Sequence, residues 1–168
     1  MKERVQPKKF DKEASDRKTN WCGPFAAQRV LESRGVLYTL QELANLLDTN
    51  KNGYTDIKEI HRFFEVLRYP VTEKSEATFQ NLRDEIANRN AVLVSRMARS
   101  KGNKLYEHIS AVDLISRNSI VLVEQVGDHS LTGLQFERYD KEAFLKLWYD
   151  SLSPGCYLAV GRKRKRRR

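Results

Sequence analysis

The sequence reads Asn20-Trp21-Cys22-Gly23-Pro24 directly before an apolar-periodic segment, residues 25–31, so a helix is predicted to begin at the cysteine. A helix N-terminus presents unpaired backbone N–H groups and a partial positive charge, which lower the pKa of a thiol placed there. Gly23 is expected to let a substrate backbone approach one side of Cys22, with the Trp21 ring as a wall on the other. Cys22 is therefore a candidate nucleophile. The alternative is a small buried residue at the start of a core helix.

Length and composition indicate one globular domain between two polar ends. The chain has 168 residues, of which 40% are hydrophobic and 32% are charged, and this is enough for a sizeable core. We expect a loosely ordered N-terminal segment at 1–15, a folded domain at 16–161 and a disordered basic tail at 162–168. The sequence has no apolar run of the roughly 18 residues that cross a membrane and no secretory signal. A cytoplasmic, reducing location is therefore expected.

The net charge of +9 is concentrated at the C-terminus. Seven consecutive cations form the basic tail: Arg162, Lys163, Arg164, Lys165, Arg166, Arg167 and Arg168. The rest of the chain is close to charge balance. A block of like charges repels itself and stays solvated, where it binds phosphate polymers, anionic membranes or acidic proteins, or serves as an address. The tail therefore predicts nucleic acid or another polyanion as a partner.

Hydrophobic periodicity predicts helices in the first half of the chain and mostly strands in the second. Thr39 and Glu42 have the spacing of a capping box at the start of the second helix. A turn at 116–118 joins two of the strands into a hairpin. Helices are predicted at 22–33, 40–47, 57–67, 75–88 and 141–149, and strands at 91–97, 106–115, 119–125 and 156–160. This order is typical of an α+β fold.

His108 lies near the start of the first hairpin strand. A helix-borne cysteine that faces a strand-borne histidine suits nucleophilic thiol catalysis, because the imidazole takes the thiol proton and returns it to the leaving group. Glu124 lies on the returning strand, where its carboxylate would orient the ring. We therefore predict that Cys22, His108 and Glu124 form a catalytic set. Asp113 and Asp128 are other candidates for the orienting carboxylate, and the alternative for Glu124 is an exposed strand end.

The same segments carry a family resemblance. They are Asn20-Trp21-Cys22-Gly23-Pro24, the helical pair from Leu40 to Leu67, Glu107-His108-Ile109-Ser110-Ala111-Val112 and the segment from Tyr139 to Trp148. In order and spacing the chain resembles the papain-like cysteine peptidases of the bacteriocin-processing, double-glycine leader peptidase type. The resemblance implies a papain-like fold with N-terminal helices packed on a mostly antiparallel sheet. It also implies a peptide substrate and chemistry that requires no cofactor.

Two positions depart from the pattern of that family. Asp16 stands where the family has a glutamine that helps to bind the oxyanion, and a carboxylate is a poor donor. Loss of one such donor costs about 10²–10³ in turnover, so the Asn20 amide and the Cys22 backbone N–H become the candidates for charge stabilisation. Glu124 stands where the family has an aspartate. Two interpretations follow, a slow or specialised peptidase and a relative that kept the fold and lost the activity.

A second motif, residues 48–59, matches the calcium-loop pattern D-x-[DN]-x-[DN]-G-x5-E between two predicted helices. The ligands in such a site would be Asp48, Asn50, Asn52, Tyr54 through its carbonyl, Asp56 through water and Glu59. Against this interpretation, Thr55 replaces the usual apolar residue and the sequence has no second loop to pair with it. The alternative is a solvated turn between two helices.

The sequence as a whole thus predicts a cysteine peptidase or a related thiol acyl-transfer enzyme that acts on a peptide. Two alternatives belong to other classes of function. One is an inactive peptidase-like interaction module whose basic tail binds nucleic acid or another polyanion. The other is a calcium-binding module.

Overall fold

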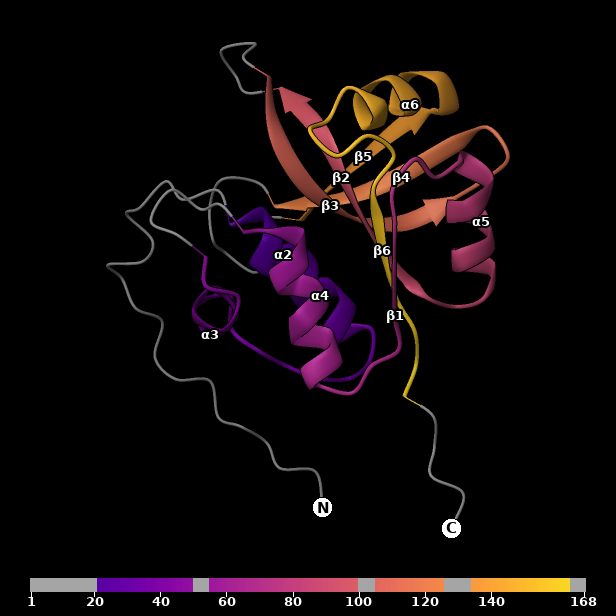
Figure 1. Ribbon diagram of the computed structural model, residues 1–168. Coiled ribbons are helices and arrows are strands. Elements are labelled where there is room, and N and C mark those ends of the chain that lie inside the picture. Colours follow the sequence, from indigo (N-terminus) through magenta and orange to yellow (C-terminus); the bar gives the residue numbers. More distant parts are fainter. Residues whose placement is uncertain (1–20, 50–54, 100–104, 126–133, 164–168) are drawn as a thin grey trace.

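The computed structural model describes residues 21–49, 55–99, 105–125 and 134–163, and it confirms an α+β fold (Figure 1). Its helices are α2 (Cys22–Glu32), α3 (Leu40–Leu46), α4 (Ile57–Val66), α5 (Phe79–Ala87) and α6 (Lys141–Tyr149). Its strands are β1 (Val71–Lys74), β2 (Ala91–Arg99), β3 (Leu105–Ile115), β4 (Ser119–Gln125), β5 (Leu134–Asp140) and β6 (Tyr157–Val160).

The six strands form one sheet in the order β1-β6-β2-β3-β4-β5, and every neighbouring pair is antiparallel. The predicted hairpin is confirmed as β3 and β4, with Ala111 opposite Val123. The two edge strands, β1 and β5, were not predicted. Three of the four β1 side chains are exposed, and Phe136 on β5 is 55% exposed. Edge strands of this kind lack the regular burial that makes a strand visible in a sequence.

Capping residues set where the helices begin. Thr39 and Glu42 form the predicted capping box of α3, with Thr39 Oγ1 accepting the N–H of Glu42 at 3.1 Å. The predicted helix at 75–88 begins later, at Phe79, because Thr78 caps it in a second capping box and the chain before it bends away from β1. No helix within the described residues is long and apolar enough to cross a membrane.

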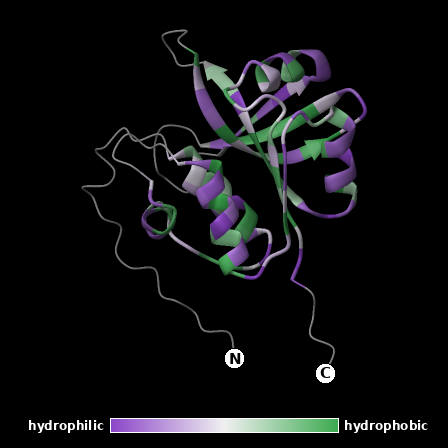
Figure 2. Ribbon diagram, in the orientation of Figure 1, coloured by the Kyte–Doolittle hydropathy of each residue, from purple (hydrophilic) through white to green (hydrophobic). Residues whose placement is uncertain are grey.

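Each face of the sheet packs against its own set of helices (Figure 1). On one face, side chains of α2, α3 and α4 pack on Leu93 and Leu158. On the other, side chains of α5 and α6, among them Phe144 and Trp148, pack on Val92 and Leu122. Figure 2 shows hydrophobic residues concentrated in the central strands and both kinds of residue on the helices. The sheet is thus a rigid, buried support for any side chain that projects from β2, β3 or β4.

Candidate active site

Cys22 is the first residue of α2, as the sequence predicts. Trp21 occupies the N-cap position, and the first hydrogen bond of the helix runs from the Phe25 N–H to the Trp21 carbonyl at 2.9 Å. The backbone N–H groups of Cys22 and Gly23 therefore have no partner within the helix, and Pro24 has no N–H to satisfy. Two N–H donors and the positive end of the helix dipole are thus available next to the thiol.

Gly23 is buried against Thr55, which corrects the expectation that it leaves space for a substrate. A Cβ added to Gly23 would lie 2.5 Å from Thr55 Cβ, 2.7 Å from its Oγ1 and 2.9 Å from its Cγ2. Thr55 is itself buried and shares a hydrogen bond of 2.7 Å with the Thr49 hydroxyl. The glycine is therefore required by packing, since it lets the start of α2 lie directly on this threonine pair.

We expect Gly23→Ala to destabilise the protein by about 1–3 kcal/mol, the usual cost of overpacking, and to displace the start of α2 together with Cys22. Urea unfolding followed by tryptophan fluorescence measures the first effect, and the rate of Cys22 alkylation measures the second. Adding Thr55→Gly removes all three clashing atoms and should recover part of the lost free energy. An equal loss in Gly23→Ala with and without Thr55→Gly would show that this contact is not the cause.

His108 lies on β3 and is buried, with 8% of its surface exposed. Its Nε2 and Glu124 Oε2 are 2.5 Å apart, so the predicted partners on the hairpin do meet. Its Nδ1 is buried and makes no well-formed hydrogen bond. This is the ring nitrogen left for Cys22, whose thiol interacts with His108. Hydrogen bonds between nucleophile and base are often long or poorly aligned in a free enzyme.

The electrostatic coupling between Cys22 and His108 favours the charged forms of both groups. Burial alone raises the pKa of Cys22, but the hydrogen bond and positive charge of His108, aided by the Ile109 N–H, outweigh it and lower that pKa. Burial alone lowers the pKa of His108, but hydrogen bonds to Cys22 and Glu124 and their negative charges raise it to about 9. The interaction therefore favours the thiolate–imidazolium pair over the neutral thiol and imidazole.

Glu124 is buried and remains a carboxylate because it is surrounded by donors. Burial raises its pKa, but the hydrogen bond and charge of His108, the charge of Arg96 and the hydrogen bond from Ser110 lower it below its usual range. Its Oε1 accepts the Ser110 hydroxyl at 2.5 Å and Arg96 Nη2 at 2.7 Å, while Oε2 accepts His108. Sequence reasoning missed Arg96 and Ser110. The signal for Arg96 was a lone cation within the apolar run of β2.

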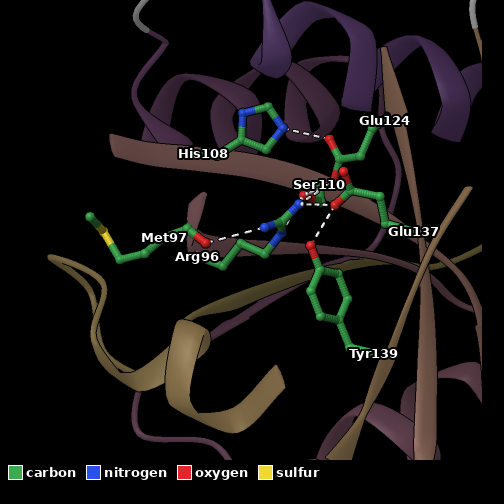
Figure 3. Close-up of polar contacts among 7 residues, drawn as sticks. All are labelled: Arg96, Met97, His108, Ser110, Glu124, Glu137 and Tyr139. Carbon is green, nitrogen blue, oxygen red and sulfur yellow. Dashed lines mark hydrogen bonds and ion pairs between the residues drawn. The ribbon is translucent and has the colours of Figure 1, made fainter. Parts of the chain in front are cut away.

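Arg96 connects this site to β5, as Figure 3 shows. Its Nη2 also donates to Glu137 Oε2 at 3.0 Å, and the Tyr139 hydroxyl donates to the same oxygen at 2.5 Å. The guanidinium carbon lies 5.3 Å from the centre of the Tyr139 ring. The polar contacts therefore run without a break from His108 to Tyr139 across β3, β4, β2 and β5.

Only some of the other predicted site residues lie within the described part of the chain. Asp16 and Asn20, the candidates near the oxyanion, and Asp128, an alternative orienting carboxylate, lie outside it. Asp113 is described, and it is exposed on β3. Among these candidate carboxylates, the one in contact with His108 is that of Glu124. The role of Asn20 or Asp16 in charge stabilisation stays a prediction.

The candidate calcium loop is also partly outside the described residues, which do not include Asn50, Asn52 and Tyr54. Of the other proposed ligands, Asp56 caps α4 by accepting the Lys58 N–H at 2.9 Å, and Glu59 pairs with Arg62 at 3.3 Å. Asp48 is exposed and has a positive φ of 49°. Calcium binding stays a prediction.

The basic tail contributes two described residues, Arg162 and Lys163, and both are exposed. Lys163 Nζ lies 4.5 Å from the centre of the Tyr69 ring. The positive charge of Arg162 contributes, after burial, to lowering the pKa of Arg34. The remaining tail cations, residues 164–168, lie outside the described chain, and binding of nucleic acid or another polyanion stays a prediction.

Cys156 differs from Cys22 in every respect that governs thiol reactivity. Both cysteines are free, but Cys156 is 2% exposed and lies directly before the last strand, whereas Cys22 is partly exposed. Burial and the nearby negative charge of Glu73 raise its pKa to about 11. Cys156 is therefore expected to be inert where Cys22 is reactive.

Comparison with known proteins identifies the family to which this chain belongs. A search of curated protein sequences finds no significant match. The fold is similar to that of the peptidase domain of Streptococcus ComA, a bifunctional ABC transporter involved in quorum sensing, with a TM-score of 0.61 and 21% identity over 85% of this chain and 93% of that one. It is also similar to a protein described as a C39-like peptidase from Bacillus anthracis, with a TM-score of 0.60 and 10% identity over 87% of this chain and 90% of that one. The sequence model of the Peptidase_C39 like family matches residues 4–154, and the chain therefore belongs to that family.

Proposed function

We propose that this protein is a cysteine peptidase in which Cys22 is the nucleophile, His108 is the general acid and base, and Glu124 orients the imidazole. The observation that carries the proposal is the position of His108, buried with Nε2 on Glu124 and with Nδ1 left for Cys22. Membership of a C39-like peptidase family supports the reaction class. The substrate is a peptide bond in a peptide or protein.

Hydrolysis in this site proceeds in two stages. The Cys22 thiolate attacks the peptide carbonyl carbon, and the negative charge that develops on the carbonyl oxygen is stabilised by the Cys22 N–H at the start of α2. His108 then gives its proton to the leaving amine, the C–N bond breaks and a thioester remains on Cys22. In the second stage His108 takes a proton from water, the resulting hydroxide attacks the thioester, and the C–S bond breaks, which releases the acid product and restores the Cys22 thiolate and the His108 imidazolium.

The test is the pH dependence of Cys22 alkylation by iodoacetamide, measured in a Cys156→Ser background so that a single thiol reports. The rate should rise with a midpoint well below the ordinary cysteine pKa of about 8.5. His108→Ala should raise that midpoint, because the imidazolium that stabilises the thiolate is lost. Circular dichroism of both proteins verifies that the fold is retained.

A midpoint at or above about 8.5 that does not respond to His108→Ala would exclude the catalytic proposal. The chain would then be a peptidase-like protein that has kept the fold and lost the activity. A lowered midpoint that depends on His108 would justify a search for substrates, and peptides that contain a Gly-Gly cleavage site are the first choice because the sequence resembles the double-glycine leader peptidases.

A further inference from the structure

Arg96 is a fully buried cation beside the catalytic set. It lies on β2, opposite His108 in the register of β2 and β3, and is 2% exposed. A buried guanidinium is costly unless its donors are satisfied. All three nitrogens of Arg96 are satisfied: Nε donates to Ser110 Oγ at 3.0 Å, Nη1 to the Met97 carbonyl at 3.1 Å, and Nη2 to both Glu124 and Glu137. The guanidinium is therefore held in one position by partners on β2, β3, β4 and β5.

The contacts of Arg96 divide the two oxygens of Glu124 between different partners. Arg96 and Ser110 occupy Oε1, so that Oε2 is left to His108. A glutamate has one more rotatable bond than the aspartate that the family resemblance implies at this position. This additional rotational freedom must be removed if the Glu124 carboxylate is to orient the His108 ring. The contacts of Arg96 and Ser110 at Oε1 remove it.

The charges along this row of side chains alternate. Thiolate at Cys22, imidazolium at His108, carboxylate at Glu124, guanidinium at Arg96 and carboxylate at Glu137 follow one another. Two carboxylates that share one site repel each other, so that one of them takes up a proton unless a cation lies between them. Arg96 Nη2 is that cation, at 2.7 Å from one carboxylate and 3.0 Å from the other.

We propose, on the basis of the function proposed above, that Arg96 is a positioning residue for catalysis: it keeps Glu124 ionised beside Glu137 and directs its free oxygen to His108. Arg96 contacts neither Cys22 nor the reacting atoms, and it acts through Glu124. Without the guanidinium, nothing would hold Oε1 of Glu124 or separate its carboxylate from that of Glu137, so Glu124 would turn away, His108 would lose its anionic partner, and the thiolate of Cys22 would lose the imidazolium.

The test compares Arg96→Met, Arg96→Lys and the parent in a Cys156→Ser background, with the pH midpoint of Cys22 alkylation as the readout. Arg96→Met should raise the midpoint, and each unit by which the midpoint exceeds neutral pH lowers the thiolate fraction at that pH by about tenfold. Arg96→Lys keeps a cation but loses the fork geometry, so its midpoint should lie between those of the parent and Arg96→Met. If Arg96→Met does not fold, the comparison rests on Arg96→Lys.

A compensating variant separates positioning from a purely structural role. Glu137→Gln added to Arg96→Met removes the second carboxylate, and should bring the midpoint part of the way back because Glu124 is no longer repelled by a neighbouring negative charge. Leu82→Ala, on α5 in the core between that helix and the sheet, is the control for stability alone, and it should lower the free energy of unfolding without moving the midpoint.

Two results overturn the proposal in distinguishable ways. If the alkylation midpoint of the parent is not lowered, or does not change on His108→Ala, the function proposed above is wrong and this inference fails with it. A parent midpoint that is lowered and depends on His108, together with folded Arg96 variants that leave it unchanged, means that the catalytic pair is real and that Arg96 only supports the fold.

Discussion

Replacing Cys22 by Ala is expected to abolish hydrolysis of a fluorogenic peptide that ends in a Gly-Gly aminomethylcoumarin amide. Removal of a catalytic nucleophile typically lowers turnover by about 10⁴-fold or more, because the steps that depend on it are lost together. His108→Ala should be similarly inactive. Cys156→Ala is the matched control, since that thiol is buried and its pKa is raised to about 11, and it should keep the parental turnover.

The pH profile of this turnover should be bell-shaped, because the reaction requires thiolate and imidazolium together. Turnover rises with pH as Cys22 loses its proton, and this limb lies at lower pH than for an ordinary cysteine because the pKa of Cys22 is lowered. It falls as His108 loses its proton, and the pKa of His108 at about 9 sets this alkaline limb. Turnover that survives Cys22→Ala would show that the activity has another origin.

Glu124→Ala is expected to destabilise the protein by about 3–5 kcal/mol, the cost of removing one partner of a buried ion pair. The substitution leaves Arg96, which is 2% exposed, and the buried His108 without their shared carboxylate. Urea unfolding at neutral pH gives the free energy directly. Glu65→Ala, on the exposed side of α4, is the control, since its side chain is 63% exposed and its loss should change the free energy of unfolding by less than about 0.5 kcal/mol.

The loss of folding free energy caused by Glu124→Ala should depend on pH in a defined direction. The pKa of Glu124 is lowered in the folded protein, so its stabilising contribution is present above the pKa of an unfolded glutamate, about 4.3, and is lost as the pH falls through the folded value. The difference between parent and variant should therefore shrink in acid. A difference that stays below about 1 kcal/mol at pH 7 would contradict the idea of a tightly coupled buried pair.

The sequence was sufficient to predict that the three proposed catalytic residues lie together, because each belongs to an element with a strong local pattern. Cys22 precedes an apolar helical period, and His108 and Glu124 lie on the two strands of a hairpin whose turn is visible in the sequence. The spacing of a hairpin determines which residues face each other, so the contact at 2.5 Å between His108 and Glu124 follows from local information.

The supporting residues could not be predicted in the same way because they depend on tertiary pairing. Arg96 reaches Glu137 only through β5, an edge strand that the burial pattern does not reveal. The role of Gly23 was assigned incorrectly for a similar reason, since its constraint comes from Thr55, in a segment distant in the sequence. Local periodicity places a residue on an element, whereas the neighbours across elements appear only when the elements are packed.

The order of elements along the chain means that Cys22 is synthesised before the residues that contact it. Cys22 is made first, its histidine and glutamate come from the later hairpin, and the core beneath α2 includes Leu158 and Val160 of the last strand. During synthesis on the ribosome, the cysteine therefore emerges long before the groups that activate it and the strand that completes its support. The proposed peptidase activity is thus expected to arise only after the last strand of the domain has been synthesised and packed.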